Sequence, residues 1–189
     1  MEKIERINVI IAIFVLLTLS MQFLFLSMES NQLAAKLIGN NPYLKLIGTS
    51  NNIIMFLYPS CLFIFLIVTT KLMLDIFNIT SIDSMHIFMS LGLSCIIPML
   101  GMFFYVISFI LFRIEEPITN DSINKLQFST GLSIDDYKTI NNFCWIIMFY
   151  IMTMRFYLKY DISIIKSLAI CTLPTALSVL LGYFVKNFI

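Results

Sequence analysis

The chain is 189 residues long, with 59% hydrophobic residues, 12% charged residues and a formal net charge of +1. Soluble domains carry about 45–50% apolar and about 25% charged residues, so this composition is typical of a chain that lies in a membrane. A net charge of +1 gives no reason to expect nucleic acid as a partner, because binding it requires a concentrated basic surface.

Five stretches carry almost only apolar side chains between neighbouring charged residues. A helix needs about 20 apolar residues to cross the hydrocarbon core of a bilayer. The fourth stretch is shorter, but Arg155 can extend its side chain to the interface and let the helix continue to Leu158. The sequence therefore predicts an all-α, polytopic helical bundle forming one membrane domain, 1–189, with spans at about 7–27, 51–70, 87–112, 139–158 and 166–186.

The first span follows a charged start, residues 1–6, as a secretion signal would. Its apolar run continues to Phe25 and Leu26, which is longer than the core of a signal, and no small-x-small cleavage site follows. We expect this span to be retained. After it, residues 30–38 predict a separate short amphipathic helix along the membrane interface, with Ser30 as its N-cap and Gly39 as its C-terminal stop.

The other connections differ in length and polarity. The second, 71–86, is expected to extend the second helix before a turn at residues 78–80. The third, 113–138, is the longest polar loop, and its Ser133-x-x-Asp136 pattern is typical of a capping box at the start of a helix. The fourth is short, which predicts an antiparallel hairpin of the last two spans.

Orientation is nearly balanced, because Lys and Arg number six on each predicted side of the membrane. The first helix and the short fourth connection carry the most weight in such a comparison. Both favour a cytoplasmic amino terminus.

Few residues offer chemistry. The four cysteines are Cys61, Cys95, Cys144 and Cys171, one in each of four different spans. None of them forms a C-x-x-C pair, so neither a zinc site nor a thiol-disulfide relay is predicted. No metal or cofactor is expected. Phosphate-binding loops, nucleophile elbows and intramembrane carboxylate pairs are also absent from the sequence. Arg155 is the sole charge within a predicted span, which argues against an ion-coupled transporter acting alone.

His86 is the only histidine, and it stands at the mouth of the third span, three residues after Asp83. At this spacing the two side chains can pair on one helical face. We interpret His86 as an interfacial polar anchor, with a pH-sensitive or catalytic role as the alternative. Glu115-Glu116 resembles the acidic residues of intramembrane glutamate proteases, but those enzymes need basic and histidine partners, and one histidine would have to serve for all.

Small residues form a stripe along the third span and another along the fifth, at steps of three, four or seven. Such stripes let helices approach closely in lipid. They predict that spans three and five pack on one another, with Ser94, Pro98 and Gly101 against Cys171, Ser178 and Gly182. The alternative is that the stripes form a self-association face. Pro59, Pro98 and Pro174 should bend their spans, because each removes one backbone hydrogen bond.

Four short motifs lie in the carboxy-terminal two-thirds of the chain. Residues 94–101 read SCIIPMLG, a polar loop ends in GLS at 131–133, FCW follows at 143–145, and IIKSLA opens the last span at 164–169. From about Ser84 to Val185 the chain thereby resembles the Yip-domain family of five-span membrane proteins. The Asp-Leu-Tyr-Gly-Pro signature of its eukaryotic members is absent. The resemblance implies a prokaryotic-type member without known chemistry, and it transfers no functional residue.

These features together predict a non-enzymatic membrane protein, a scaffold or accessory subunit in a prokaryotic cytoplasmic membrane, whose partners are the lipid bilayer and other membrane proteins or itself. One alternative is a transporter component with a polar cavity drawn from Asn141, Asn142, Ser94 and Thr172. A second is an immunity protein against a peptide toxin. A third is an intramembrane enzyme that uses His86 with Asp83 or with Glu115-Glu116.

Overall fold

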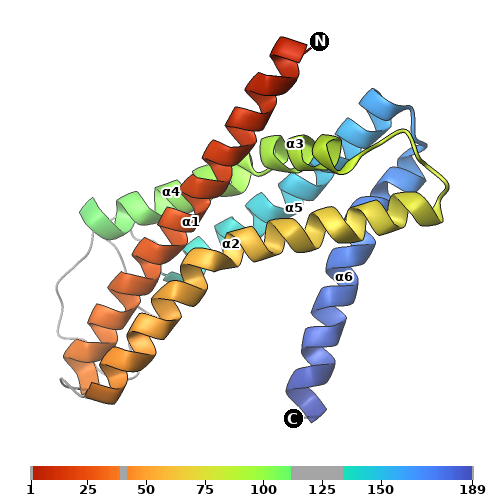
Figure 1. Cartoon of the computed structure of the whole chain (residues 1–189). Helices are drawn as coiled ribbons and strands as arrows, with labels where there is room; N and C mark the ends of the chain where they lie inside the picture. Colours follow the sequence, from red (N-terminus) through yellow and green to blue (C-terminus); the bar gives the residue numbers. More distant parts are fainter. Residues whose placement is uncertain (1, 39–41, 112–133, 189) are drawn as a thin grey trace. The chain divides into compact units, whose positions relative to one another are not determined.

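Every element that the structure describes is an α-helix, and no strand occurs among these residues (Figure 1). The computed structural model describes residues 2–38, 42–111 and 134–188; within these ranges it leaves out the side chains of 2–3, 33–34, 36–38, 42, 44, 111, 134–135 and 177–188. The all-α prediction is confirmed for this part of the chain. The helices are α1 Glu2–Ile38, α2 Pro42–Ile76, α3 Ser84–Ser94, α4 Ile96–Leu111, α5 Ile134–Tyr160 and α6 Ile164–Phe188.

Three helical stretches are long and apolar enough to cross a membrane. They are Ile4–Gln32 in α1, Lys45–Ile76 in α2 and Ser84–Ile110 in α3 and α4, and they contain the first two predicted spans and nearly all of the third. Among the described side chains, α6 adds a shorter apolar stretch, Ile164–Ala176, and α5 does not reach the same length and apolarity. The fourth and fifth crossings therefore stay predictions.

The outward faces of these stretches are as apolar as the inward ones. In their most apolar parts only 28%, 22% and 39% of the residues are buried, so most side chains are partly or fully exposed. On α1, Ala12, Val15 and Leu19 are buried while Phe14 and Leu17 are exposed. A water-soluble helix would place polar residues on its exposed face. An apolar side chain at an exposed position is instead what a helix surrounded by lipid requires.

Helix α1 corrects one sequence prediction, because it continues without a break to Ile38. The prediction of a separate interfacial helix at residues 30–38 is therefore wrong. Ser30 lies inside α1, where it cannot cap the start of a helix. Residues 28–38 contain neither Gly nor Pro, and Ala34, Ala35 and Lys36 are strong helix formers that offset one interior serine. The next helix, α2, begins at Pro42, a residue well tolerated in the first turn.

The third predicted span is interrupted between α3 and α4 at Cys95. Pro98 explains the position, because proline lacks the N–H that would bond to the Ser94 carbonyl and its ring crowds that carbonyl. Cys95 keeps right-handed helical dihedrals, with φ −73° and ψ −3°, and its N–H donates to the Leu91 carbonyl at 2.9 Å. Pro59 and Pro174 lie inside helices that continue past them.

The described residues form two compact units, each built from several chain segments. Among the described residues, unit 1 comprises 2–13, 61–96 and 146–188, and unit 2 comprises 14–38, 42–60, 97–111 and 134–145. Helices α1, α2 and α5 each contribute residues to both units.

Helix α3 forms the centre of unit 1, since six of its eleven residues are buried. Phe88 packs edge-on against Phe63 of α2, with ring centroids 6.3 Å apart. Gly92 meets Ala12 of α1, and a Cβ at Gly92 would lie 2.6 Å from the Ala12 Cα. Just after α3, the Cys95 thiol lies 3.2 Å from the Met148 sulfur of α5.

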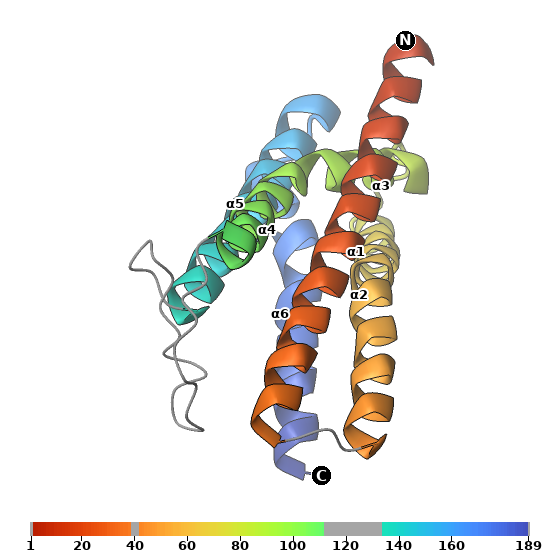
Figure 2. The same cartoon turned by 90° about the vertical axis from the view of Figure 1, so that its left-hand side faces the viewer.

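Unit 2 consists of two helix pairs. The later part of α1 and the first part of α2 lie side by side in both views (Figure 1 and Figure 2), with Phe23 packed on Tyr58. In the α4–α5 pair, the rings of Tyr105 and Tyr137 stack at 5.1 Å, and Ser108 shares a hydrogen bond with Tyr137. Phe25 and Leu26 of α1 pack against the buried Phe109 and Tyr137, which ties α1 to the second pair.

Candidate functional site

One end of unit 1 gathers polar residues from five helix ends. Here α1, α3 and α6 begin, and α2 and α5 end. Lys71 at the end of α2 donates to the Ile82 carbonyl at 3.0 Å, just before α3. The Lys166 ammonium, near the start of α6, lies 5.9 Å from the centroid of the Phe77 ring. These contacts hold the connections 77–83 and 161–163 at the same end of unit 1.

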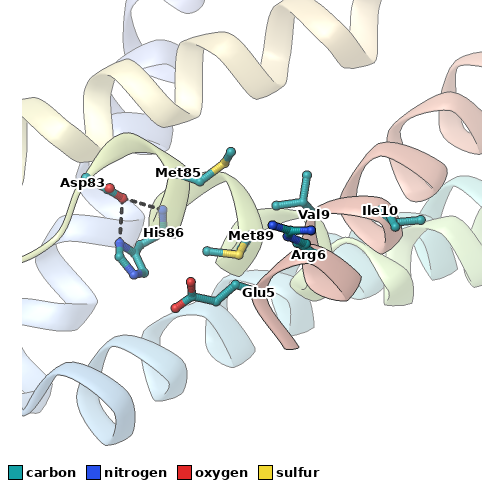
Figure 3. A pocket seen from close by; sticks show the side chains of 8 residues that line it. All are labelled: Glu5, Arg6, Val9, Ile10, Asp83, Met85, His86 and Met89. Carbon is teal, nitrogen blue, oxygen red and sulfur yellow. Dashed lines mark hydrogen bonds and ion pairs between the residues drawn. The ribbon is translucent and has the colours of Figure 1, made fainter. Parts of the chain in front are cut away.

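Asp83 and His86 are joined at the start of α3. The Asp83 Oδ1 accepts the backbone N–H of His86 at 2.8 Å and lies 2.6 Å from its Nδ1, so Asp83 is the N-cap of α3 (Figure 3). The donated backbone N–H of His86 is the main reason that the pKa of Asp83 lies below its ordinary value of 3.8. The predicted pairing of Asp83 with His86 is confirmed, although Asp83 precedes the helix as its cap.

His86 also contacts α5. Its ring meets the Tyr160 ring edge-on, with centroids 5.9 Å apart and an interplanar angle of 84°. The imidazole is thus held by a carboxylate and by an aromatic ring. This is the arrangement of a positioned polar anchor at a helix end.

A pocket of about 490 Å³ opens beside this pair. Its lining comes from the first turns of α1 and from α3 with its cap (Figure 3): Glu5, Arg6, Val9, Ile10, Asp83, Met85, His86 and Met89. The walls are mainly aliphatic and thioether side chains, and the charged groups belong to residues near the ends of the helices. The lining therefore has the character of an amphiphile site.

The pocket lining holds no serine, threonine or cysteine, so the Asp83–His86 pair has no hydroxyl or thiol there to activate. Across the described side chains, no group of three His, Cys, Asp or Glu residues could hold a metal ion. Glu115-Glu116 lies outside the described residues.

The predicted small-residue stripes are described in part. Gly101 faces α5, and a Cβ there would lie 2.6 Å from the Cys144 sulfur. Ser94, Pro98 and Cys171 are buried. The side chains of Ser178 and Gly182 lie outside the described residues, so packing of the third span on α6 stays a prediction.

Two of the four polar residues proposed for a transporter cavity form hydrogen bonds within their own helices. Ser94 donates to the Ser90 carbonyl and Thr172 to the Leu168 carbonyl, each at 2.8 Å within its own helix. Asn142 is exposed, whereas the Asn141 Oδ1 is buried without a hydrogen-bond partner among the described residues. Ser94 and Thr172 belong to unit 1 and the two asparagines to unit 2, so a cavity shared by the four residues stays a prediction.

Sequence reasoning missed a polar cluster in unit 2 that joins α1 to α2. The Asn52 Oδ1 accepts from the Ser27 Oγ and the Asn31 Nδ2, both at 2.8 Å. Asn31 also donates to the Gly48 carbonyl at 3.0 Å, and Asn51 donates to Ser27 at 3.0 Å. We call Ser27, Asn31, Asn51 and Asn52 the asparagine clasp. The four-residue step between Ser27 and Asn31, repeated from Gly48 to Asn52, is the signal that could have revealed it.

Comparison of the chain with protein-family models, curated proteins and solved structures finds no match.

Proposed function

We propose that this protein is a multi-span integral membrane protein without catalytic activity, acting as a scaffold or accessory subunit of a membrane complex. It crosses the bilayer five times, through α1, α2, α3 with α4, α5 and α6, as the resemblance to the Yip-domain family implies. The observation that carries the proposal is the set of three long apolar helices whose outward faces are themselves apolar. Such surfaces are stable only when lipid or another membrane protein covers them.

The polar end of unit 1 supports five crossings. Successive crossings alternate in direction, so alternate connections must lie on the same side of the membrane. The connections 77–83 and 161–163 are held together there by the contacts of Lys166 and His86 with Phe77 and Tyr160. If the chain stopped crossing after α4, the connection 161–163 would lie on the opposite side of the membrane from 77–83.

Asp83 caps α3 through the backbone of His86, and the His86 ring packs on Tyr160, which favours a positioning role for the pair over catalysis. The proposal expects His86→Ala to leave membrane abundance and cellular phenotype unchanged, because His86 then serves only to anchor the start of α3. Loss of phenotype at normal abundance, shared by Asp83→Asn, would overturn the non-enzymatic assignment. Immunoblotting of membrane fractions and a growth assay in the deletion strain measure both quantities.

Purification of the tagged protein from its native membrane in a mild detergent tests the scaffold role. We expect a second membrane protein, or a second copy of this chain, in stoichiometric amounts by mass spectrometry. A solitary monomer that retains full activity in the cellular assay would contradict the proposal.

A further inference from the structure

We propose that the pocket between the first turns of α1 and α3 binds one phospholipid with an ethanolamine headgroup. This inference rests on the membrane placement proposed above and adds a ligand to it. The observation behind it is a mainly apolar pocket with a carboxylate and a guanidinium among the residues that line it.

The apolar walls suit an acyl chain. Val9 and Ile10 of α1 and Met85 and Met89 of α3 supply aliphatic and thioether surface around about 490 Å³. This volume falls within the range of about 300–1,000 Å³ that is usual for small-molecule pockets. The two methionines are flexible, and they can adapt to a chain of variable conformation.

The pocket lies at the depth of a lipid headgroup. The apolar stretch of α1 begins at Ile4, so Glu5 and Arg6 stand in the first turn of a helix that enters the membrane. Asp83 and His86 stand in the same relation to the stretch that begins at Ser84. An acyl chain following the helices inward would leave its headgroup among these four residues.

The charges select the headgroup. Glu5 is half-buried and has no hydrogen-bond or ion-pair partner among the side chains that the structure describes. A carboxylate beside apolar walls is strongly stabilised by a cation that also donates hydrogen bonds. Arg6 already interacts with another group, but a guanidinium has five N–H donors, so further donors can bind phosphate in the fork geometry. Together they match the ammonium and the phosphate of one zwitterionic headgroup.

Other headgroups match less well. A choline ammonium carries no N–H to donate to Glu5, and a glycerol headgroup carries no cation at all. A net anionic lipid would also face the carboxylates of both Glu5 and Asp83, of which Asp83 is already occupied by His86. Specificity for the ethanolamine headgroup thus has two sources. Its ammonium pairs with the Glu5 carboxylate, and the choline, glycerol and anionic headgroups lack this pair or are repelled.

The test uses the full chain, purified in a mild detergent and stripped of lipid. It is titrated with phosphatidylethanolamine, phosphatidylcholine and phosphatidylglycerol of identical acyl chains, and native mass spectra give the bound fraction. We expect the ethanolamine lipid to bind about tenfold more tightly than the other two, and Glu5→Gln to remove that preference. Asp161→Asn is the matched control: it removes a carboxylate near the start of α6, outside the pocket, at a φ of 54° that asparagine adopts readily.

Val9→Phe provides a second variant, because it fills the pocket and should lower binding of the ethanolamine lipid about tenfold with unchanged thermal unfolding. Equal binding of the three lipids, or an ethanolamine preference that survives Glu5→Gln, would overturn the lipid site. Extraction of native membranes with alkaline carbonate separates this failure from failure of the membrane placement. A protein that stays in the membrane yet shows no preference refutes the lipid site alone, and a protein released by carbonate refutes the placement.

Discussion

Helix α1 is held in two different ways along its length. In unit 1 its first part meets α3 through Ala12 and Gly92, which approach so closely that no side chain fits at Gly92. In unit 2 its later part is joined to α2 by the asparagine clasp, with hydrogen bonds of 2.8–3.0 Å. Both are known solutions to one physical problem. Helices in lipid gain little from apolar burial, so they associate through close van der Waals packing or through interhelical hydrogen bonds.

The two contacts tolerate change differently. A close backbone approach fails when any atom is added, because neither helix can move aside without losing the rest of its packing. A network of four polar side chains shares its bonds among several partners. Removing one member leaves the others partly satisfied.

Gly92→Leu should produce the largest loss of stability, because the new side chain must occupy the space of Ala12. We expect the free energy of unfolding in detergent micelles to fall by about 3 kcal/mol. Met85→Leu, an exposed position on the same helix with a similar volume, should change it by less than about 0.5 kcal/mol. Thermal unfolding followed by circular dichroism measures both, and a loss for Gly92→Leu no larger than the control would break the comparison.

Asn52→Leu should have a smaller effect, because it removes the shared acceptor of the clasp while Asn31 keeps its bond to Gly48. We expect a loss of about 1 kcal/mol, within the range found for hydrogen bonds between membrane helices. Asn142→Leu is the matched control, since this asparagine is exposed on α5 in the same unit. Equal unfolding temperatures for the two variants would show that the asparagine clasp does not stabilise the fold.

Asp83→Asn should have the smallest effect, because asparagine caps a helix as well as aspartate and only the charge is lost. The folded-state pKa of Asp83 is lowered, so its charge stabilises the fold above pH 3.8 and this contribution disappears as the pH falls through the lowered value. We expect a loss of about 0.3 kcal/mol at pH 7 that shrinks as the pH is lowered below 3.8. Unfolding in low salt at pH 7 and at a series of pH values below 3.8 provides the measurement. A penalty that stayed constant over this series would show that it comes from lost capping geometry and not from the charge.

The sequence predicted the helices well where a single physical rule decides them. Lack of charge over more than 20 residues locates the stretches in α1, α2 and α3 with α4. Pro98 locates the break at Cys95. The prediction failed at Ser30, because a capping residue is read from local pattern, whereas the helix formers after it let α1 continue.

The site was predictable only in its local part. Asp83 and His86 are three residues apart, so their pairing follows from helix geometry. The pocket also needs Glu5 and Arg6, which lie far away in the chain and meet α3 only through tertiary packing. The close contact at Gly92 was not predictable for the same reason. One glycine in an apolar helix does not indicate which other helix approaches it.

If the chain crosses the membrane five times, Asp161 lies on the same side of the membrane as Thr80. In a variant whose four native cysteines are replaced by alanine, single cysteines at Thr80, Asp161 and Ile189 are labelled from one side of intact cells with a membrane-impermeant reagent. Five crossings place Thr80 and Asp161 on one face and Ile189 on the other. Labelling that separates Thr80 from Asp161, or groups Ile189 with both, would contradict the account.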